Sequence, residues 1–104
     1  MMCGFFAIVA RRDAAVLLTE ARAKDAGLAR GEDQGFLHGM PQAIKDLSPV
    51  QGMVTSMGSP NLMHAVSATD SLMVARMRAA GAIFIGRTNT PEFGLGSHTF
   101  NPVH

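Results

Sequence analysis

The sequence predicts an α/β fold, with a mixed and partly parallel sheet flanked by helices. Short extended segments alternate along the chain with two stretches that have helical periodicity and capping residues. The 104 residues leave room for one domain with a core of modest size. They contain no internal repeat, low-complexity segment or linker. We therefore treat residues 1–104 as one unit.

The first long element is predicted to be a helix from about Asp13 to Ala29. Asp13 is of the residue type preferred at a helix N-cap, and Gly31 suits the C-terminal stop. Glu20 and Lys24 are spaced as an i,i+4 ion pair. Three apolar side chains fall on one face of this helix: Leu17, Ala21 and Leu28.

Three later segments are predicted to be extended. One runs from about Met40 to Lys45 and has Pro41 near its start, where a missing N–H does least harm. The stretch from Gly52 to Ser59 is interpreted as a second short extended piece. The run AIFIG, Ala82 to Gly86, is continuously apolar, which is typical of a strand covered on both faces.

A second helix is predicted from about Thr69 to Ala80. Ser67 and Asp70 match the S/T-x-x-D/E capping pattern, and Gly81 suits the end of the helix. Met73, Met77 and Ala80 share one face of it. The tail that follows residue 86 is rich in Gly, Pro, Asn and Thr and is predicted to be loop.

The composition is apolar and poor in charge, with 47% hydrophobic and 16% charged residues. We interpret this as a sign that part of the apolar surface meets protein absent from this chain. The formal net charge is +1, with Lys and Arg scattered, so no basic patch for nucleic acid is indicated. The single cysteine, Cys3, excludes a disulfide within the chain and fits a reducing compartment.

The opening segment, MMCGFFAIVARR, is predicted to be a strand or a ragged start. Its positive charges follow the apolar run, whereas a signal peptide carries them before it. No apolar run approaches the roughly 20 residues that span a bilayer. We therefore expect a cytoplasmic protein without a membrane partner.

Metal, phosphate and serine chemistry receive little support from the motifs. The four histidines show no metal-ligand spacing: His38, His64, His98 and His104. Gly94-x-Gly96 is only half of a dinucleotide fingerprint. Four serines are candidate nucleophiles, and none lies in G-x-S-x-G: Ser48, Ser56, Ser59 and Ser97. We expect no metal and no other cofactor.

Lys45 stands at the end of an extended apolar segment and has two interpretations. It is either an ordinary solvated lysine, or a desolvated lysine that is neutral at pH 7 and accepts a proton. Because side chains alternate along a strand, Lys45 and Asp46 point to opposite sides. We expect Lys45 to face the interior with Ala43, and Asp46 to bind backbone N–H groups of the turn from Leu47 to Pro49.

The segment LHGMPQAIKD resembles the LHG-I/L-P-x-A-x-KD segment of the amidase signature family. Further matches follow in order. Gly52, Thr55, Gly58 and Ser59 are similar to that family's G-x-x-T-x-x-GS. Residues 76–102, RMRAAGAIFIGRTNTPEFGLGSHTFNP, resemble its R-x-A-G-A-x-x-x-G-K-T-N-x-P-E-F…N-P. The resemblance covers nearly the whole chain from about Ala7 onward.

The resemblance implies a serine hydrolase with an α/β/α fold that cleaves amide bonds through a Ser–cis-Ser–Lys triad. In this sequence the triad lysine is Lys45, the base that acts through the cis serine. The family's two serines belong to a GGSSGGS region that these 104 residues do not contain. Arg87 stands where the family usually has Lys, at a position to which we assign no catalytic role.

We therefore interpret residues 1–104 as a partial amidase domain that provides the lysine and is inactive alone, with a small-molecule amide as the substrate of the full-length family. Two other hypotheses remain open. The chain is a non-catalytic interaction module that forms homo-oligomers, or a piece of the amidase-like subunit of a tRNA-dependent amidotransferase, which works with partner subunits. If the chain is a partial amidase domain, its partner is the missing C-terminal portion.

Overall fold

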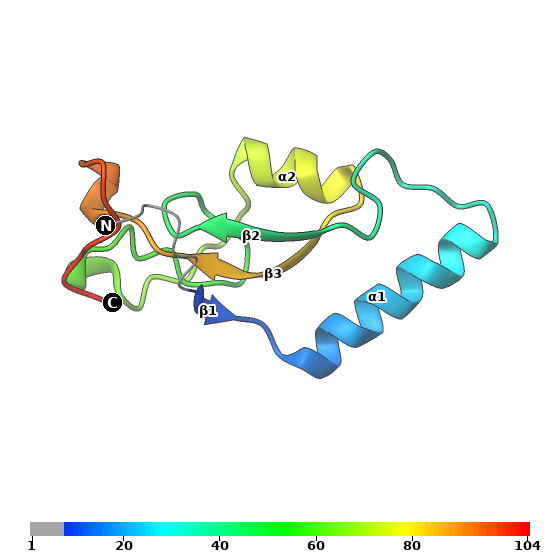
Figure 1. Ribbon diagram of the computed structural model, residues 1–104, viewed down its shortest axis with the longest axis horizontal. Helices are drawn as coiled ribbons and strands as arrows, with labels where there is room; N and C mark the ends of the chain where they lie inside the picture. The colour runs from blue at the N-terminus through cyan, green and yellow to red at the C-terminus, as the bar shows by residue number, and fades with distance from the viewer. Residues whose placement is uncertain (1–7) are drawn as a thin grey trace.

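The computed structural model describes residues 8–104, so Cys3 and the start of the opening segment lie outside the described residues. The chain forms three strands, two α-helices and two short 3-10 helices within this range (Figure 1). In chain order the elements are β1 (Ile8–Arg11), α1 (Ala14–Ala29), β2 (Pro41–Lys45), η1 (Pro60–Leu62), α2 (Leu72–Ala79), β3 (Ile83–Thr88) and η2 (Glu92–Gly94).

The three strands form one mixed sheet in the order β1-β3-β2. β3 is central and pairs antiparallel with β1 and parallel with β2. The parallel pair ends with Lys45 opposite Thr88, so both strands finish at the same edge of the sheet. This arrangement confirms the predicted α/β class and its partly parallel sheet.

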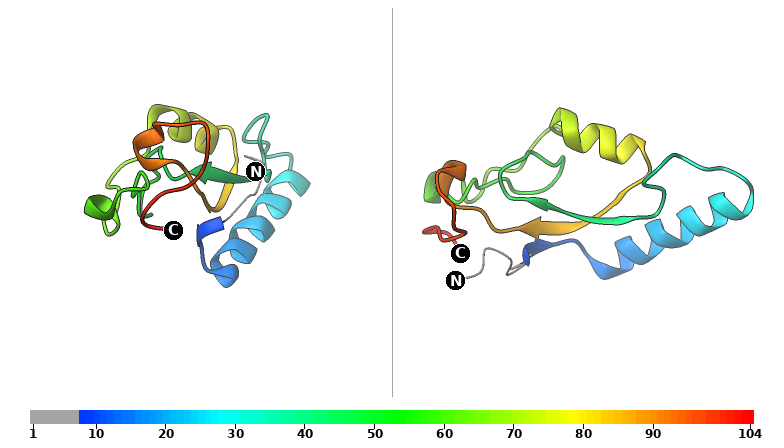
Figure 2. Two further views of the ribbon diagram at one scale, coloured as in Figure 1. Left: turned by 60° about the vertical axis from the view of Figure 1, so that its left-hand side comes forward. Right: turned by 45° about the horizontal axis from the view of Figure 1, so that its top comes forward.

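The core lies between the sheet and α2, which covers one face of it (Figures 1 and 2). Val74 of α2 has no exposed surface and Phe84 of β3 is only 1% exposed. The buried cluster comprises Ile44, Val50, Val74, Ala82 and Phe84, and Leu37, Met53 and Met77 pack against it. The apolar run of β3 is buried at most of its positions, as its sequence predicts.

Helix α1 begins and ends as predicted, but it extends away from the sheet (Figure 1). The Asp13 carboxylate caps it by accepting the backbone N–H groups of Ala15 and Val16. Glu20 forms its direct ion pair with Arg12, at 2.5 and 2.9 Å, whereas Lys24, the partner expected from the spacing, acts on Glu20 only through its charge. The bond to Arg12 lowers the pKa of Glu20 below its ordinary value.

Two further predictions are wrong in detail. Helix α2 begins at Leu72 and is capped by the Ser71 hydroxyl, which accepts the N–H of Val74. The Ser67 hydroxyl, which the capping pattern placed at this helix end, lies 2.7 Å from Thr55 Oγ1. The stretch 52–59 is a series of turns with one isolated bridge, Val54 to Val66, and forms no strand of the described sheet.

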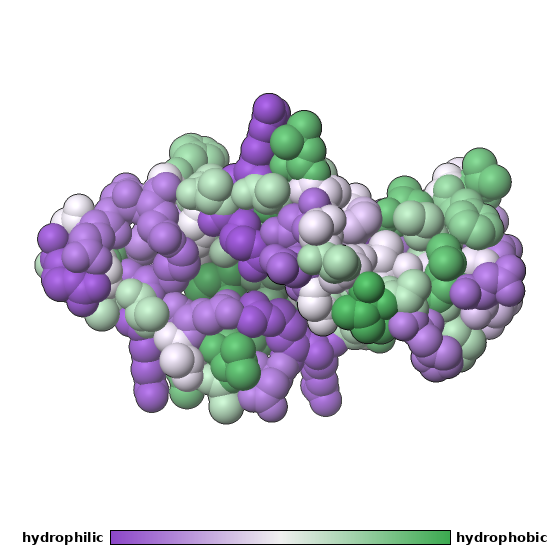
Figure 3. Space-filling view, turned by 180° about the vertical axis from the view of Figure 1, so that it is seen from behind, coloured by the Kyte–Doolittle hydropathy of each residue, from purple (hydrophilic) through white to green (hydrophobic). Residues whose placement is uncertain are grey.

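Many large apolar side chains are exposed. They lie on α1, on α2 and in the loops, and Phe36 (93%) and Leu95 (81%) are the most exposed of them. On the face that Figure 3 presents, apolar surface forms separate patches with polar residues between them. Among residues 8–104, no helix is long and apolar enough to cross a membrane.

Candidate active site

Lys45 is the last residue of β2, at the edge where the two parallel strands end. In open α/β sheets, ligands bind in the crevice outside the carboxyl ends of the strands. Lys45 itself is exposed, while Ile44 and Asp46 on either side of it are buried. The expectation that Lys45 faces the interior is therefore wrong for this chain, because the large apolar Ile44 occupies the inward position.

Asp46 fixes the chain directly after Lys45. Its N–H donates to the Thr88 carbonyl at 2.8 Å, and its own carbonyl accepts the N–H of Met57 at 3.0 Å. The carboxylate accepts the backbone N–H of Ser56 at 2.9 Å and also accepts the Ser56 hydroxyl. Asp46 therefore binds a loop ten residues away, and the predicted bonds to the turn from Leu47 to Pro49 are wrong.

Arg87 lies beneath this turn, with no exposed side-chain surface. Its Nη2 donates to the Ser48 carbonyl at 2.7 Å and to Thr55 Oγ1 at 3.2 Å, and lies 3.4 Å from Asp46 Oδ1. Burial lowers the pKa of the Arg87 guanidinium, and the nearby Asp46 carboxylate acts in the opposite direction. A buried cation and a buried anion thus meet next to the end of β2.

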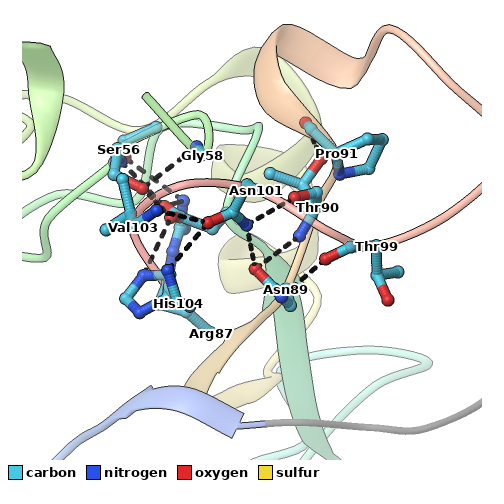
Figure 4. A network of polar contacts seen from close by, with 12 residues as sticks. Ser56, Gly58, Arg87, Asn89, Thr90, Pro91, Thr99, Asn101, Val103 and His104 are labelled. Atoms are coloured by element: carbon cyan, nitrogen blue, oxygen red, sulfur yellow. Dashed lines mark hydrogen bonds and ion pairs between the residues drawn. The ribbon is translucent and has the colours of Figure 1, made fainter. Parts of the chain in front are cut away.

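Two asparagines hold the tail against the same edge (Figure 4). Asn101 Nδ2 donates to Asn89 Oδ1 at 2.5 Å and to the Thr90 carbonyl at 2.7 Å. Asn101 Oδ1 accepts the backbone N–H groups of residues 103 and 104, at 2.9 and 2.8 Å. This turn places His104 Nε2 3.9 Å from Asp46 Oδ2. The tail and the Ser56 loop therefore meet at Asp46.

Four of the other candidate residues are buried or bound to backbone atoms: Ser48, Ser56, Ser59 and His38. Ser56 and Ser59 are buried, and the Ser48 N–H donates to the Lys45 carbonyl at 3.1 Å in a turn. His38 binds backbone atoms of residues 24 and 34 instead of other candidate residues. Within residues 8–104, no cluster of three or more His, Cys, Asp or Glu side chains could hold a metal ion.

The sequence did not predict the contacts of Asp46 with Ser56 and Arg87. The three residues lie at positions 46, 56 and 87, and no local spacing relates them. A weak signal was present, because an arginine inside the otherwise apolar end of a strand must find a partner. The arrangement presents a primary amine, Lys45 Nζ, on a strand end that buried polar contacts hold in place.

Three comparisons relate this chain to known proteins. A model of the amidase family matches residues 8–104. The chain is 48% identical over 84 residues to a glutamyl-tRNA(Gln) amidotransferase subunit of Alkaliphilus metalliredigens, covering 81% of this chain and 17% of that protein. It is 38% identical over 97 residues to an acylamidase of Rhodococcus erythropolis, covering 89% of this chain and 19% of that protein.

Solved structures agree with these matches. The peptide amidase of Stenotrophomonas maltophilia superposes with a TM-score of 0.71 at 35% identity, over 85% of this chain and 17% of that chain. The chain thus spans 17–19% of the length of these three relatives. Since the family model matches residues 8–104, all of the residues that the structure describes, the chain belongs to the amidase family.

Proposed function

We propose that this chain provides the lysine-bearing strand end of an amidase active site, and that the complete site hydrolyses carbon–nitrogen bonds of amides. The observation that carries the proposal is the position of Lys45. Lys45 is exposed at the carboxyl edge of the parallel pair. The next residue, Asp46, is buried, and its N–H, carbonyl and carboxylate all form hydrogen bonds. A lysine that acts as a general base needs a fixed backbone, which sets its position, and an amine that can reach its reaction partner.

In this proposal Lys45 is the general base of a Ser–cis-Ser–Lys triad. Its neutral amine accepts a proton from the cis serine hydroxyl, which in turn takes the proton of the nucleophilic serine. The 104 residues contain no GGSSGGS sequence, so both serines come from the rest of the amidase domain. That part would also cover Lys45 and exclude water from the site. We expect the chain alone to show no amide hydrolysis above background.

Reconstitution tests the proposal. The 104-residue chain is mixed with the separately expressed remainder of the Stenotrophomonas maltophilia peptide amidase, from which the matching segment has been deleted. Hydrolysis of a simple peptide amide is then measured. The chain has two lysines, Lys24 and Lys45, so Lys24→Ala is a matched control. We expect Lys45→Ala to lower the rate by a factor on the order of 10³ and Lys24→Ala to leave it unchanged. Equal rates for both variants would contradict the proposal.

A second candidate function is that of an amidotransferase component. The observation in its favour is that several relatives at 40–48% identity are named as subunits of a glutamyl-tRNA(Gln) amidotransferase. The two functions differ in what the reconstituted assembly requires. Hydrolysis of simple amides without tRNA supports the amidase. Activity that arises only after further subunits and glutamyl-tRNA(Gln) are added supports the amidotransferase. The cytoplasmic location stays a prediction under both.

A further inference from the structure

Arg87 occupies a site whose shape is set by three acceptors. Asp46 Oδ1, the Ser48 carbonyl and Thr55 Oγ1 all lie within 3.4 Å of a single nitrogen, Nη2. The other two guanidinium nitrogens, Nε and Nη1, are buried and have no hydrogen-bond partner among the described residues. The acceptors therefore converge on one point, whereas a guanidinium spreads its donors over three nitrogens.

The same three acceptors suit an ammonium group better than a guanidinium. Nη2 carries two hydrogens, one fewer than the acceptors around it, whereas a lysine Nζ carries three. A lysine at position 87 whose Nζ took the place of Nη2 would also leave no buried N–H without a partner, and such an unpaired group is costly. The three acceptors thus require one buried, positively charged nitrogen at the position of Nη2.

Arg87 contacts residues on both sides of Lys45 in the sequence. Asp46 follows Lys45 directly, and the Lys45 carbonyl accepts the Ser48 N–H at 3.1 Å. Arg87 binds the side chain of Asp46 and the carbonyl of Ser48, so it holds the turn that begins at Lys45 at two points. β3 in turn holds Arg87, whose backbone pairs with Ile44, the residue before Lys45.

We propose that Arg87 is a positioning residue for Lys45: through Asp46 and the Ser48 carbonyl it fixes the turn that aims the lysine amine into the active site. This inference rests on the proposed function of Lys45 as a base. It adds a residue that never touches the substrate, with a defined chemical requirement, namely one positive charge that donates to three acceptors.

The test uses three variants of the 104-residue chain in the reconstituted assembly. Arg87→Met removes the charge with similar volume, and Arg87→Lys keeps it. The double variant Arg87→Met/Asp46→Asn removes both buried charges together. No unpaired charge is then left in the interior, so this variant folds even if the single Met variant does not. We expect Arg87→Lys to retain kcat within about threefold. Both Met-containing variants should lower kcat at least about tenfold with KM nearly unchanged, as expected when transition-state stabilisation is lost.

Two results would overturn the inference. One is a folded Arg87→Met/Asp46→Asn chain with the kcat of the unmodified chain. The other is an Arg87→Lys chain as slow as the Met variants, since a charge at this point would then not suffice. A merely structural role predicts that stability and kcat recover together in the double variant, whereas a positioning role predicts that only stability recovers.

The inference can fail separately from the proposed function. If the unmodified chain gives no activity in the assembly, the proposed function is contradicted, and amide hydrogen exchange of the isolated chain decides the role of Arg87. Slow exchange at the N–H groups of Ser56 and Met57, which donate to Asp46, should persist in Arg87→Lys and be lost in the double variant. Slow exchange retained in the double variant would show that Arg87 does not fix this turn.

Discussion

Helix α1 and the carboxyl end of the sheet are held in different ways. Over its 16 residues α1 buries only Gly27, and its side chains Val16, Leu18 and Leu28 are about half exposed. At the end of β2, by contrast, Asp46 and Ser56 are at most 2% exposed and Arg87 not at all. The helix owes its form to local signals, whereas the strand end owes its form to contacts between distant residues.

The difference has a functional meaning in the proposed amidase. A base must keep its position relative to its serine partners, so it belongs on the rigidly held part of the chain. Helix α1, by contrast, leaves its apolar side chains exposed and makes few contacts with the rest of this chain. The comparison therefore predicts where substitutions act strongly and where they act weakly.

The largest effect is expected for Asp46→Ala. It leaves the buried Arg87 guanidinium without its counter-ion and removes the acceptor of the Ser56 bonds. We expect a loss of about 3–5 kcal/mol in the free energy of unfolding, measured by urea denaturation. Asp25→Ala, at an exposed position of α1, is the matched control and should change it by less than about 0.5 kcal/mol. Similar losses in both variants would break the comparison.

Two glycines with left-handed backbone sharpen the same contrast. Gly81 has φ +97°, and a Cβ there would lie 2.6 Å from His38 Cα. Gly31, after α1, has φ +77° with no neighbour within 4 Å of such an atom. We expect Gly81→Ala to cost about 2–3 kcal/mol and Gly31→Ala about 1 kcal/mol. Thermal unfolding of the two variants measures the difference, and the reverse order would contradict this packing.

Asp70 gives a pH-dependent contribution near α2. Its carboxylate accepts the Arg78 Nε–H at 2.7 Å and the Gln51 N–H at 2.7 Å, and the bond to Arg78 lowers its pKa below the ordinary value. The folded state therefore binds this proton less readily than the unfolded state. The resulting stability is present above about pH 4 and lost as the pH falls through the lowered pKa.

The variant Asp70→Asn checks this sign. At pH 7 we expect it to be less stable than the unmodified chain by about 1–2 kcal/mol. This lies below the roughly 1.5–3 kcal/mol typical of hydrogen bonds to charged groups, because the Arg78 side chain is partly exposed. The gap should shrink steadily as the pH is lowered from about 5 to about 2. Urea denaturation across this range measures the gap, and a gap that widens at low pH would show that the sign is wrong.

The smallest global effect is expected for Asp13→Ala. The substitution removes the cap that accepts the Ala15 and Val16 N–H groups, which costs a helix about 1 kcal/mol. Because α1 has few contacts with the sheet, we expect faster amide exchange in its first turn and little change in global unfolding. Asp13→Asn keeps an acceptor and is the control. A global loss equal to that of Asp46→Ala would contradict the loose attachment of α1.

The sequence was informative where structure is determined locally. The cap at Asp13, the strand start at Pro41 and the buried run of β3 were all predicted from neighbouring residues. The cap of α2 was misassigned because the Ser67 hydroxyl contacts Thr55, a residue twelve positions away. Local pattern alone does not distinguish a capping serine from one engaged elsewhere in the fold.

The candidate site was predictable only in part. Alternation along β2 correctly placed Lys45 and Asp46 on opposite sides, but the expectation that the Lys45 side faces the interior is wrong. The larger apolar Ile44 decides that, and its size was a usable signal. The Arg87–Asp46 contact joins residues 41 positions apart, so only the folded sheet reveals it.

Native-state hydrogen exchange of the 104-residue chain tests most directly whether the strand end at Lys45 is its fixed part. The N–H groups of Asp46, Ser56 and Met57 all take part in the hydrogen bonds at this end. They should exchange at least about tenfold more slowly than the N–H groups within α1, such as that of Leu17. Equal exchange in the two regions, or slower exchange in α1, would contradict a fixed strand end beside a loosely held helix.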